Sequence, residues 1–119
     1  MGATATLYGI SNCDQVKKAR GWLDSQRIAF QFYDFKKQGV DRIMLDQWLQ
    51  QIPWEILLNR KSTTWRALSE AQRAATNNSD RAIALMIEAP SIIKRPVLVT
   101  PLHIVSGFSD DLYQRIFKN

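Results

Sequence analysis

Four short segments of the chain are predicted to be strands, the first because its side chains alternate along it and the others because they are rich in β-forming residues. Two of them, residues 4–9 and 28–34, lie near the N-terminus, and two more, residues 97–100 and 103–106, follow the middle of the chain. Residues 14–26 repeat apolar side chains at helical spacing instead. A strand, a helix and a strand joined by short links form a right-handed unit, so we expect the first two strands to be parallel.

The middle of the chain, residues 41–89, has almost no strand pattern and several helical ones. A polar residue that can cap a helix precedes each helical segment. The expected caps are Asp41, one of Ser62, Thr63 and Thr64, then Ser69, and Ser79. Ser69 also begins the Ser-x-x-Gln pattern of a capping box. Pro53 and Pro90 are expected to end the first and the last of these helices.

A closing helix is expected over residues 107–119, with Ser109 as its cap. The order of elements is then βαβ, a helical block, and ββα. Two such halves that share one four-stranded mixed sheet form the thioredoxin arrangement, an α/β fold. We therefore predict a single thioredoxin-like domain over residues 1–119, with a helical insertion at approximately residues 41–89 between the halves.

Composition and charge narrow the class of protein. A chain of 119 residues that is 45% hydrophobic can build one packed core. No signal-like segment and no apolar run near the ~20 residues that span a bilayer are present, so we expect a cytoplasmic protein without a membrane partner. The net charge of +5 is spread evenly along the chain, which predicts no nucleic-acid partner but suits small anionic substrates. We also expect a monomer.

Cys13 is the only cysteine, and it lies where a predicted strand gives way to a predicted helix. Helix N-termini favour a thiolate over a thiol, so Cys13 is a candidate nucleophile. Lys17, one helical turn on, would favour the thiolate further, and Ser11 or Asn12 would cap the helix and contact a ligand. The alternatives are that Cys13 is a small buried hydrophobe and that Lys17 faces water.

Arg95 and Pro96 immediately precede the third predicted strand. In thioredoxin-like folds a cis-proline opens this strand and faces the cysteine, and Pro96 occupies that position. We therefore expect Arg95 beside the sulfur of Cys13, where its fork of donors suits a carboxylate or an oxyanion. Pro96 in the cis form would expose the backbone of Arg95 to a peptide-like ligand such as glutathione.

The spacing around Cys13 argues against three other kinds of cysteine chemistry. A Cys-x5-Arg phosphatase loop needs arginine at the position of Ala19, and a Cys-x-x-Cys dithiol site needs cysteine at the position of Val16. His103, the only histidine, lies in a predicted hairpin and is expected at the surface rather than as a base. One cysteine and one histidine also cannot build a four-ligand zinc site, so no metal is expected.

Three fragments in order resemble the ArsC-like family, and the YffB-type branch within it. They are Leu7-Tyr8-Gly9-Ile10-Ser11-Asn12-Cys13-Asp14 with Lys17-Lys18-Ala19-Arg20, Leu57-Leu58-Asn59 with Thr63-Thr64-Trp65-Arg66, and Ile92-Ile93-Lys94-Arg95-Pro96-Val97. The resemblance covers essentially the whole chain. It implies a thioredoxin fold with a helical insertion that works with glutathione as co-substrate, without a tightly bound cofactor, and with glutaredoxin as a partner.

The resemblance also implies site residues. Cys13 aligns with the nucleophile of glutaredoxin-coupled arsenate reductases, and Arg95 with the arginine before their cis-proline. A second family arginine follows the Leu-Leu pair, where Arg60 is the nearer candidate and Lys61 its neighbour. A third lies beyond the predicted hairpin, where this chain has Ser106-Gly107-Phe108 and no basic residue. Lys94 is a further candidate by charge and position.

These observations predict a glutathione-dependent monothiol reductase, with arsenate reduction by Cys13 as its narrower form. A single cysteine must take its second thiol from solution, which makes a glutathione mixed disulfide the natural intermediate. One alternative is a regulator like the Spx proteins of the same family, which bind RNA polymerase. Those proteins commonly carry Cys-x-x-Cys, and Val16 breaks that pattern here. The other alternative is a family member that has lost activity.

Overall fold

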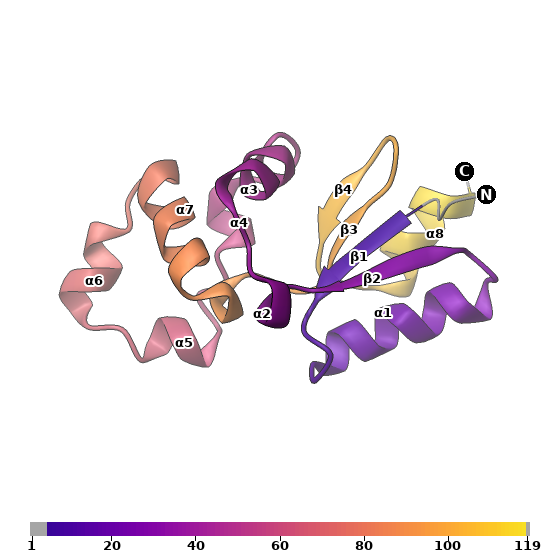
Figure 1. The fold of residues 1–119 in the computed structure, drawn as a ribbon, viewed down its shortest axis with the longest axis horizontal. Coiled ribbons are helices and arrows are strands. Elements are labelled where there is room, and N and C mark those ends of the chain that lie inside the picture. Colours follow the sequence, from indigo (N-terminus) through magenta and orange to yellow (C-terminus); the bar gives the residue numbers. More distant parts are fainter. Residues whose placement is uncertain (1–4, 119) are drawn as a thin grey trace.

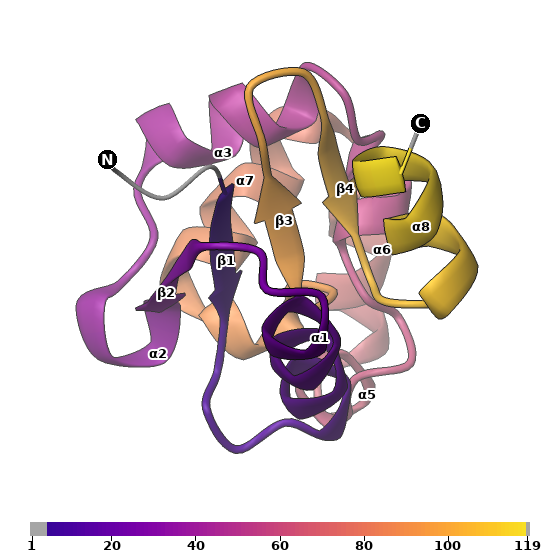
Figure 2. The same ribbon diagram turned by 90° about the vertical axis from the view of Figure 1, so that its right-hand side faces the viewer.

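The computed structural model of this chain describes residues 5–118 and contains a four-stranded mixed sheet (Figures 1 and 2). The strands are β1 (Ala5–Gly9), β2 (Phe30–Asp34), β3 (Val97–Val99) and β4 (Ile104–Ser106), in the order β2-β1-β3-β4. β1 is parallel to β2, and β3 is antiparallel to both β1 and β4. This topology confirms the predicted thioredoxin-like fold.

Two helices, α1 (Asp14–Ser25) and α8 (Asp110–Lys118), cover one face of the sheet (Figure 2). Leu7 of β1 and Leu98 of β3 are directly opposite one another, and both are fully buried in this layer. They pack in one cluster with Leu23 of α1 and Tyr113 of α8. The predicted apolar face of the first helix is thus confirmed, because it is the face that meets the sheet.

The inserted helices pack on the other face of the sheet and extend the molecule to 46 × 26 × 25 Å (Figure 1). Tyr8, which follows Leu7 and points to the opposite face, contacts Trp48 with ring centroids 5.0 Å apart. The helices are α2 (Phe35–Gln38), α3 (Arg42–Leu49), α4 (Trp54–Leu57), α5 (Thr63–Arg66), α6 (Glu70–Ala75) and α7 (Ser79–Glu88), followed by the 3₁₀ turn η1 (Pro90–Ile92).

The helical block is longer than the predicted range of residues 41–89. It begins with α2, because the carboxylate of Asp34 accepts hydrogen bonds from the backbone N–H groups of Lys36 (3.0 Å) and Lys37 (3.3 Å). Asp34 thus ends β2 and caps the next helix at once. The sequence does not reveal this helix, since a single turn is too short to show a period.

Beyond the first helix, four of the predicted caps are confirmed and one is wrong. Asp41, Ser62 and Ser109 each accept a hydrogen bond from a backbone N–H of their helices, and Ser69 forms the predicted capping box with Gln72. The cap of α7 is Asn78 rather than Ser79, because the Asn78 side chain accepts from the backbone N–H of Arg81 at 2.9 Å. The predicted strand start at Thr4 and the helix end at Asn119 lie outside the described residues.

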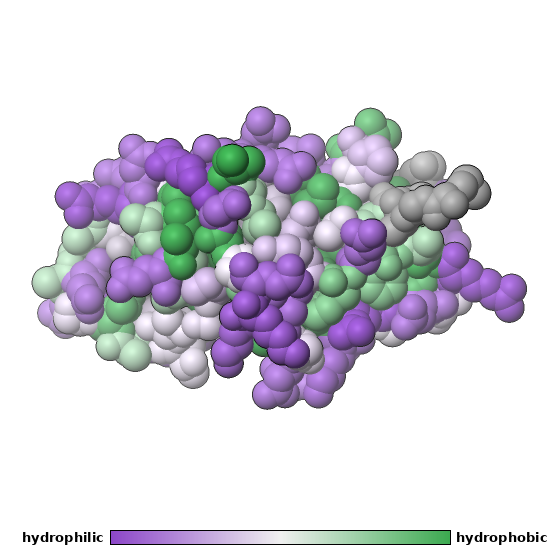
Figure 3. Space-filling view, in the orientation of Figure 1, coloured by the Kyte–Doolittle hydropathy of each residue, from purple (hydrophilic) through white to green (hydrophobic). Residues whose placement is uncertain are grey.

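The surface carries few large apolar side chains. Figure 3 shows hydrophilic side chains gathered over α2 and a small hydrophobic spot at the tip of the β3–β4 hairpin. Leu102, in that hairpin, is 79% exposed, and Ile43 of α3 is 81% exposed. Within residues 5–118 no helix has the length and apolar character needed to cross a membrane.

Candidate functional site around Cys13

Cys13 is itself the N-cap residue of α1, in an extended conformation after the loop that follows β1. The predicted capping by Ser11 or Asn12 is wrong, because both lie farther out in this loop with exposed side chains. The backbone N–H of Ser11 instead faces the carboxylate of Asp34 and helps to lower its pKa, so this loop lies next to the end of β2. The half-buried thiol of Cys13 is therefore held at the first turn of a helix.

The surroundings of the Cys13 sulfur favour the thiolate. Burial raises the pKa of Cys13, but the backbone N–H groups of Val16 and Gln15 and the guanidinium of Arg95 lower it more, so the pKa lies below its ordinary value. The two N–H groups make no capping hydrogen bond with the neutral thiol. Their effect is on the thiolate, which is the stronger acceptor. The sulfur is thus activated by a helix start and a distant arginine.

The structure places Arg95 beside Cys13, and the Arg95–Pro96 peptide bond is cis. Pro96 is buried and leads into β3. The guanidinium of Arg95 is fixed by a hydrogen bond of 2.6 Å from Nη1 to the carbonyl oxygen of Ser91. Its Nε is buried and has no hydrogen-bond partner in the described part of the chain. Arg95 is therefore anchored at Ser91 with its guanidinium beside the Cys13 sulfur.

A short antiparallel contact brings the other predicted basic residues to the same place. Leu58 pairs with Ile93, where the N–H of Asn59 donates to Ile92 O at 2.9 Å and the N–H of Lys94 donates to Leu57 O at 2.8 Å. Arg60 and Lys61, which follow Asn59, consequently lie next to Lys94.

Arg60 and Lys61 differ in how they are held. The guanidinium carbon of Arg60 lies 5.9 Å from the ring centroid of Trp65. The ring and the cation attract one another at this distance, so α5 holds the arginine side chain. Lys61 donates its backbone N–H to Asn59 Oδ1 at 3.1 Å, and its side chain is exposed.

Two adjoining hollows share Asn59 and Lys94 in their walls. One, of about 310 Å³, is lined by Gln15 and Arg95, both of which also lower the pKa of the neighbouring Cys13. The other, of about 410 Å³, is lined by Arg60 and Lys61. The hollows therefore form a basic depression that begins next to the sulfur.

Lys17 has a smaller part than predicted. Its backbone N–H donates to the carbonyl oxygen of Cys13 at 2.9 Å, as the first helical hydrogen bond of α1. Its side chain is exposed, and its ammonium is not among the groups that shift the pKa of Cys13. The thiolate is thus favoured by the helix backbone and Arg95, while Lys17 faces water.

Sequence reasoning missed one wall of the hollow beside Cys13. The turn between β4 and α8 supplies Gly107, Phe108 and Ser109 to the lining, and Leu112 follows from α8. Gly107 has a φ of +80°, a conformation that favours glycine, and its N–H donates to Pro96 O at 2.8 Å. Gly107 was the available signal, since a glycine between a strand and a helix often marks such a turn.

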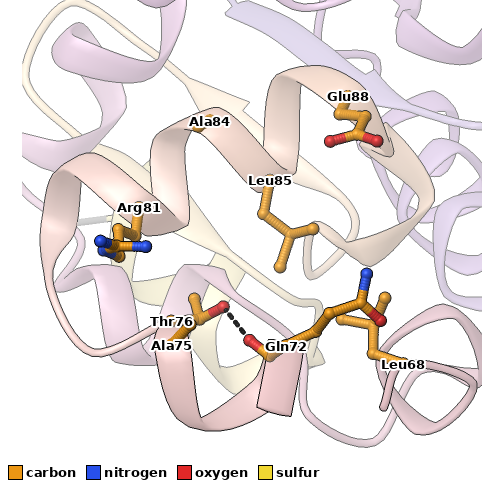
Figure 4. Close-up of a pocket in the computed structure, with 8 residues that line it drawn as sticks. All are labelled: Leu68, Gln72, Ala75, Thr76, Arg81, Ala84, Leu85 and Glu88. Carbon is orange, nitrogen blue, oxygen red and sulfur yellow. Dashed lines mark hydrogen bonds between the residues drawn. The ribbon is translucent and has the colours of Figure 1, made fainter.

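A separate groove of about 240 Å³ lies between α6 and α7 (Figure 4). Leu85 of α7 points toward Gln72 and Leu68 there, and Thr76 Oγ1 donates to the carbonyl oxygen of Gln72 at 2.9 Å. Its lining contains no cysteine or histidine. Elsewhere, no group of three or more His, Cys, Asp or Glu side chains within residues 5–118 is placed to hold a metal ion.

Comparison with solved structures finds chains of similar sequence and fold. A protein titled YffB is 46% identical, with a TM-score of 0.88 over 94% of this chain and 97% of its own. An arsenate reductase (ArsC) related protein from Brucella melitensis is 44% identical, with a TM-score of 0.75 over 100% and 97%. Both are near full-length matches, so the similarity extends to the insertion.

Comparison with curated sequences adds relatives of two kinds. A protein of Haemophilus influenzae, named only as uncharacterised, is 38% identical over 94% of this chain and 97% of its own. The global transcriptional regulator Spx 1 of Lactococcus lactis is 25% identical over 88% and 82%. The model of the ArsC family matches residues 8–116, which include Cys13, the insertion and the Arg95–Pro96 segment. The chain belongs to the ArsC family.

Proposed function

We propose that this protein is a monothiol oxidoreductase that works with glutathione. The observation that supports this most is the surroundings of the Cys13 sulfur, which lies at a helix start beside Arg95 and next to a basic hollow. No second cysteine exists in the chain to form an internal disulfide. A thiolate so placed needs an external thiol to complete a redox cycle, and glutathione is an anionic thiol that suits the basic hollow.

The thiol cycle has three exchange steps. The Cys13 thiolate attacks one sulfur of a disulfide substrate, the S–S bond breaks, and one substrate thiolate leaves and takes a proton from water. One glutathione thiolate then displaces the second substrate thiolate and leaves glutathione bound to Cys13. A second glutathione attacks this mixed disulfide, which releases the Cys13 thiolate and oxidised glutathione, so two glutathione thiols are oxidised for each substrate disulfide reduced. Arg95 stabilises the Cys13 thiolate as attacking group in the first step and as leaving group in the last.

Arsenate reduction is the narrower form of this proposal. Cys13 would displace water from arsenate while Arg95 binds the oxyanion. Glutathione would then attack the Cys13 sulfur, the S–As bond would break, and arsenic would leave as arsenite with the electron pair of that bond. Glutaredoxin would reduce the mixed disulfide that remains. The turn Ser106–Phe108 supplies no basic side chain, so arsenate has less support than thiol exchange.

Mass spectrometry after exposure to oxidised glutathione tests the general proposal. We expect one glutathione adduct on Cys13, formed at a pH where an ordinary thiol hardly reacts, and none on Cys13→Ser. An intact protein without an adduct would contradict it. A coupled assay with glutathione, glutaredoxin and arsenate tests the narrower form. Turnover that does not depend on Cys13 removes arsenate while leaving thiol exchange in place.

A regulatory function is the second candidate. The groove between α6 and α7 and the relatives named as Spx regulators favour it. In this case the insertion would bind a protein such as RNA polymerase, and Cys13 would be dispensable. Retention of RNA polymerase on the immobilised protein tests this candidate, with Leu85→Asp as the variant that should abolish retention. Equal retention by the variant, or none by either protein, would contradict it.

A further inference from the structure

We propose that Lys94 makes Cys13 selective for anionic disulfides and thiols, because its ammonium binds a carboxylate in the hollow beside the sulfur. This inference rests on the proposed thiol chemistry of Cys13 and adds a residue that decides which substrates react. It requires that the Lys94 side chain lie at the hollow, that the hollow lack a competing carboxylate, and that its shape suit a carboxylate on an apolar stem.

The backbone of Lys94 is fixed and its side chain lies over the turn between β4 and α8. Its N–H donates to Leu57 O at 2.8 Å, in the pairing that joins the insertion to the third strand. A Cβ atom added to Gly107 would lie 3.2 Å from Cε of Lys94 and 3.8 Å from its Nζ. The end of the lysine side chain thus packs against the turn, above the hollow that both residues line.

The charges at the hollow are unbalanced. Its lining contains Lys94 and Arg95 and no acidic side chain. Both ion pairs found within residues 5–118 belong to Arg42, so neither cation of the hollow is paired in this way. Arg95 is already engaged with Ser91 and the Cys13 sulfur, which leaves the ammonium of Lys94 as the less committed charge. The adjoining hollow adds Arg60 and Lys61 against the single carboxylate of Glu55.

The same hollow has an apolar side. Phe108 and Leu112, both half-buried, line it together with the hydroxyl-bearing residues Ser106 and Ser109. Its volume of about 310 Å³ is at the small end of ligand sites. An apolar stem against Phe108 with a carboxylate at Lys94 would place a ligand sulfur toward Cys13, because Gln15 and Arg95 reach both the hollow and the sulfur.

The step that Lys94 would influence is the exchange itself. The Cys13 thiolate attacks a ligand disulfide, the ligand S–S bond breaks, the Cys13–ligand S–S bond forms, and the second half of the ligand leaves as a thiolate. No electrons are gained or lost overall. Lys94 touches only the carboxylate, so it should change the rate for charged ligands relative to a neutral one.

Three small disulfides of similar size test this. They are 3,3′-dithiodipropionate (two negative charges), 2-hydroxyethyl disulfide (neutral) and cystamine (two positive charges). The rate of mixed-disulfide formation on Cys13 is measured by mass spectrometry for the unmodified protein, for Lys94→Gln, and for Lys94→Arg, which keeps the charge. Lys118→Gln, which removes an exposed charge at the end of α8, is the matched control. Comparing variants on one ligand cancels the different leaving-group pKa values of the three thiols.

We expect Lys94→Gln to lower the rate ratio of dianionic to neutral disulfide by about two- to fivefold, the range that one exposed charge pair supplies. The ratio for cystamine should rise, both effects should shrink at high salt, and Lys94→Arg and Lys118→Gln should keep the selectivity. Equal changes for all three disulfides would overturn the inference and leave Lys94 a structural residue. A Cys13 that reacts with none of them would instead overturn the proposed function.

Discussion

Replacing Gly9 with alanine tests how closely the end of β1 approaches the start of α1. A Cβ atom at Gly9 would lie 2.6 Å from Cγ2 and 3.3 Å from Cγ1 of Val16. Val16 is fully buried, and its backbone N–H is one of the groups that lower the pKa of Cys13. The contact therefore sets the distance between the strand and the helix start that carries the reactive sulfur.

The size of the effect follows from two opposing contributions. Gly9 does not have a left-handed backbone conformation, so alanine adds no strain and stabilises by about 0.4–1 kcal/mol through the unfolded chain. The clash with Val16 is overpacking in a buried site, which costs about 1–3 kcal/mol. The clash outweighs the gain, and we expect Gly9→Ala to lower the free energy of unfolding by roughly 0.5–2 kcal/mol.

Val16→Ala reverses the sign of this effect. With both γ-methyl groups removed, the nearest atom of residue 16 is its Cβ, at 3.6 Å, which is an ordinary van der Waals distance. In this background Gly9→Ala should stabilise by about 0.4–1 kcal/mol. Val16→Ala alone should cost roughly 2 kcal/mol, because two buried methyl groups are lost.

Urea unfolding followed by tryptophan fluorescence measures all four proteins of this cycle, since the chain has four tryptophans. The coupling energy should be about 1–3 kcal/mol, the cost of the clash itself. A Gly9→Ala change of the same sign and size in both backgrounds would refute the reasoning. A thiolate absorbance titration adds a second readout, because a displaced Val16 N–H should raise the pKa of Cys13.

Two further predictions concern charge. Arg95→Gln should raise the pKa of Cys13. Adduct formation with oxidised glutathione should therefore slow most in mildly acidic solution and least above the ordinary thiol pKa of about 8.5. The rates of Arg95→Lys should lie between those of Arg95→Gln and the unmodified protein, and slowing that does not depend on pH would contradict this prediction. Asp34→Ala should lower stability near neutral pH by about 1–2 kcal/mol, because the cap of α2 is lost. Burial raises the pKa of Asp34, but N–H groups of Lys37, Lys36 and Ser11 lower it more. The contribution of Asp34 is therefore present above the unfolded-state pKa and is lost as the pH falls through the lower folded-state pKa. Unfolding midpoints of the two proteins should then converge as the pH falls below the unfolded-state pKa of about 3.9, and a constant difference would argue against the charge effect.

The regular parts of the fold could be predicted because their spacing is repeated. The segments around Leu7 and Leu23 each show their period over several residues, and both residues are buried between the sheet and its helices. The one-turn helix α2 could not be predicted in this way, since residues 35–38 are fewer than two helical turns. Its only signal in the sequence is Asp34, and the strand pattern assigns that residue to the second strand.

The candidate site could also be predicted only in part. Cys13 stands out by its position between a strand and a helix, but three consecutive polar residues compete to cap that helix, and composition cannot choose among Ser11, Asn12 and Cys13. The approach of Arg95 to Cys13 could be expected only from knowledge of the fold. The pairing of Leu58 with Ile93 is a single bridge, too short for any periodic pattern to reveal.

That single bridge explains how the insertion bears on the chemistry of Cys13. The part of the insertion between Asn59 and Ile92 contains α5, α6 and α7. Hydrogen bonds between the segments around these two residues join the two ends of this part. The same bonds fix the backbone of Lys94, next to the arginine that lies beside the sulfur. Loosening of the insertion core around Leu58 would then release Lys94 and Arg95 together. The insertion therefore helps to form the basic hollow. Its stability should determine how firmly Arg95 is held beside the Cys13 thiolate.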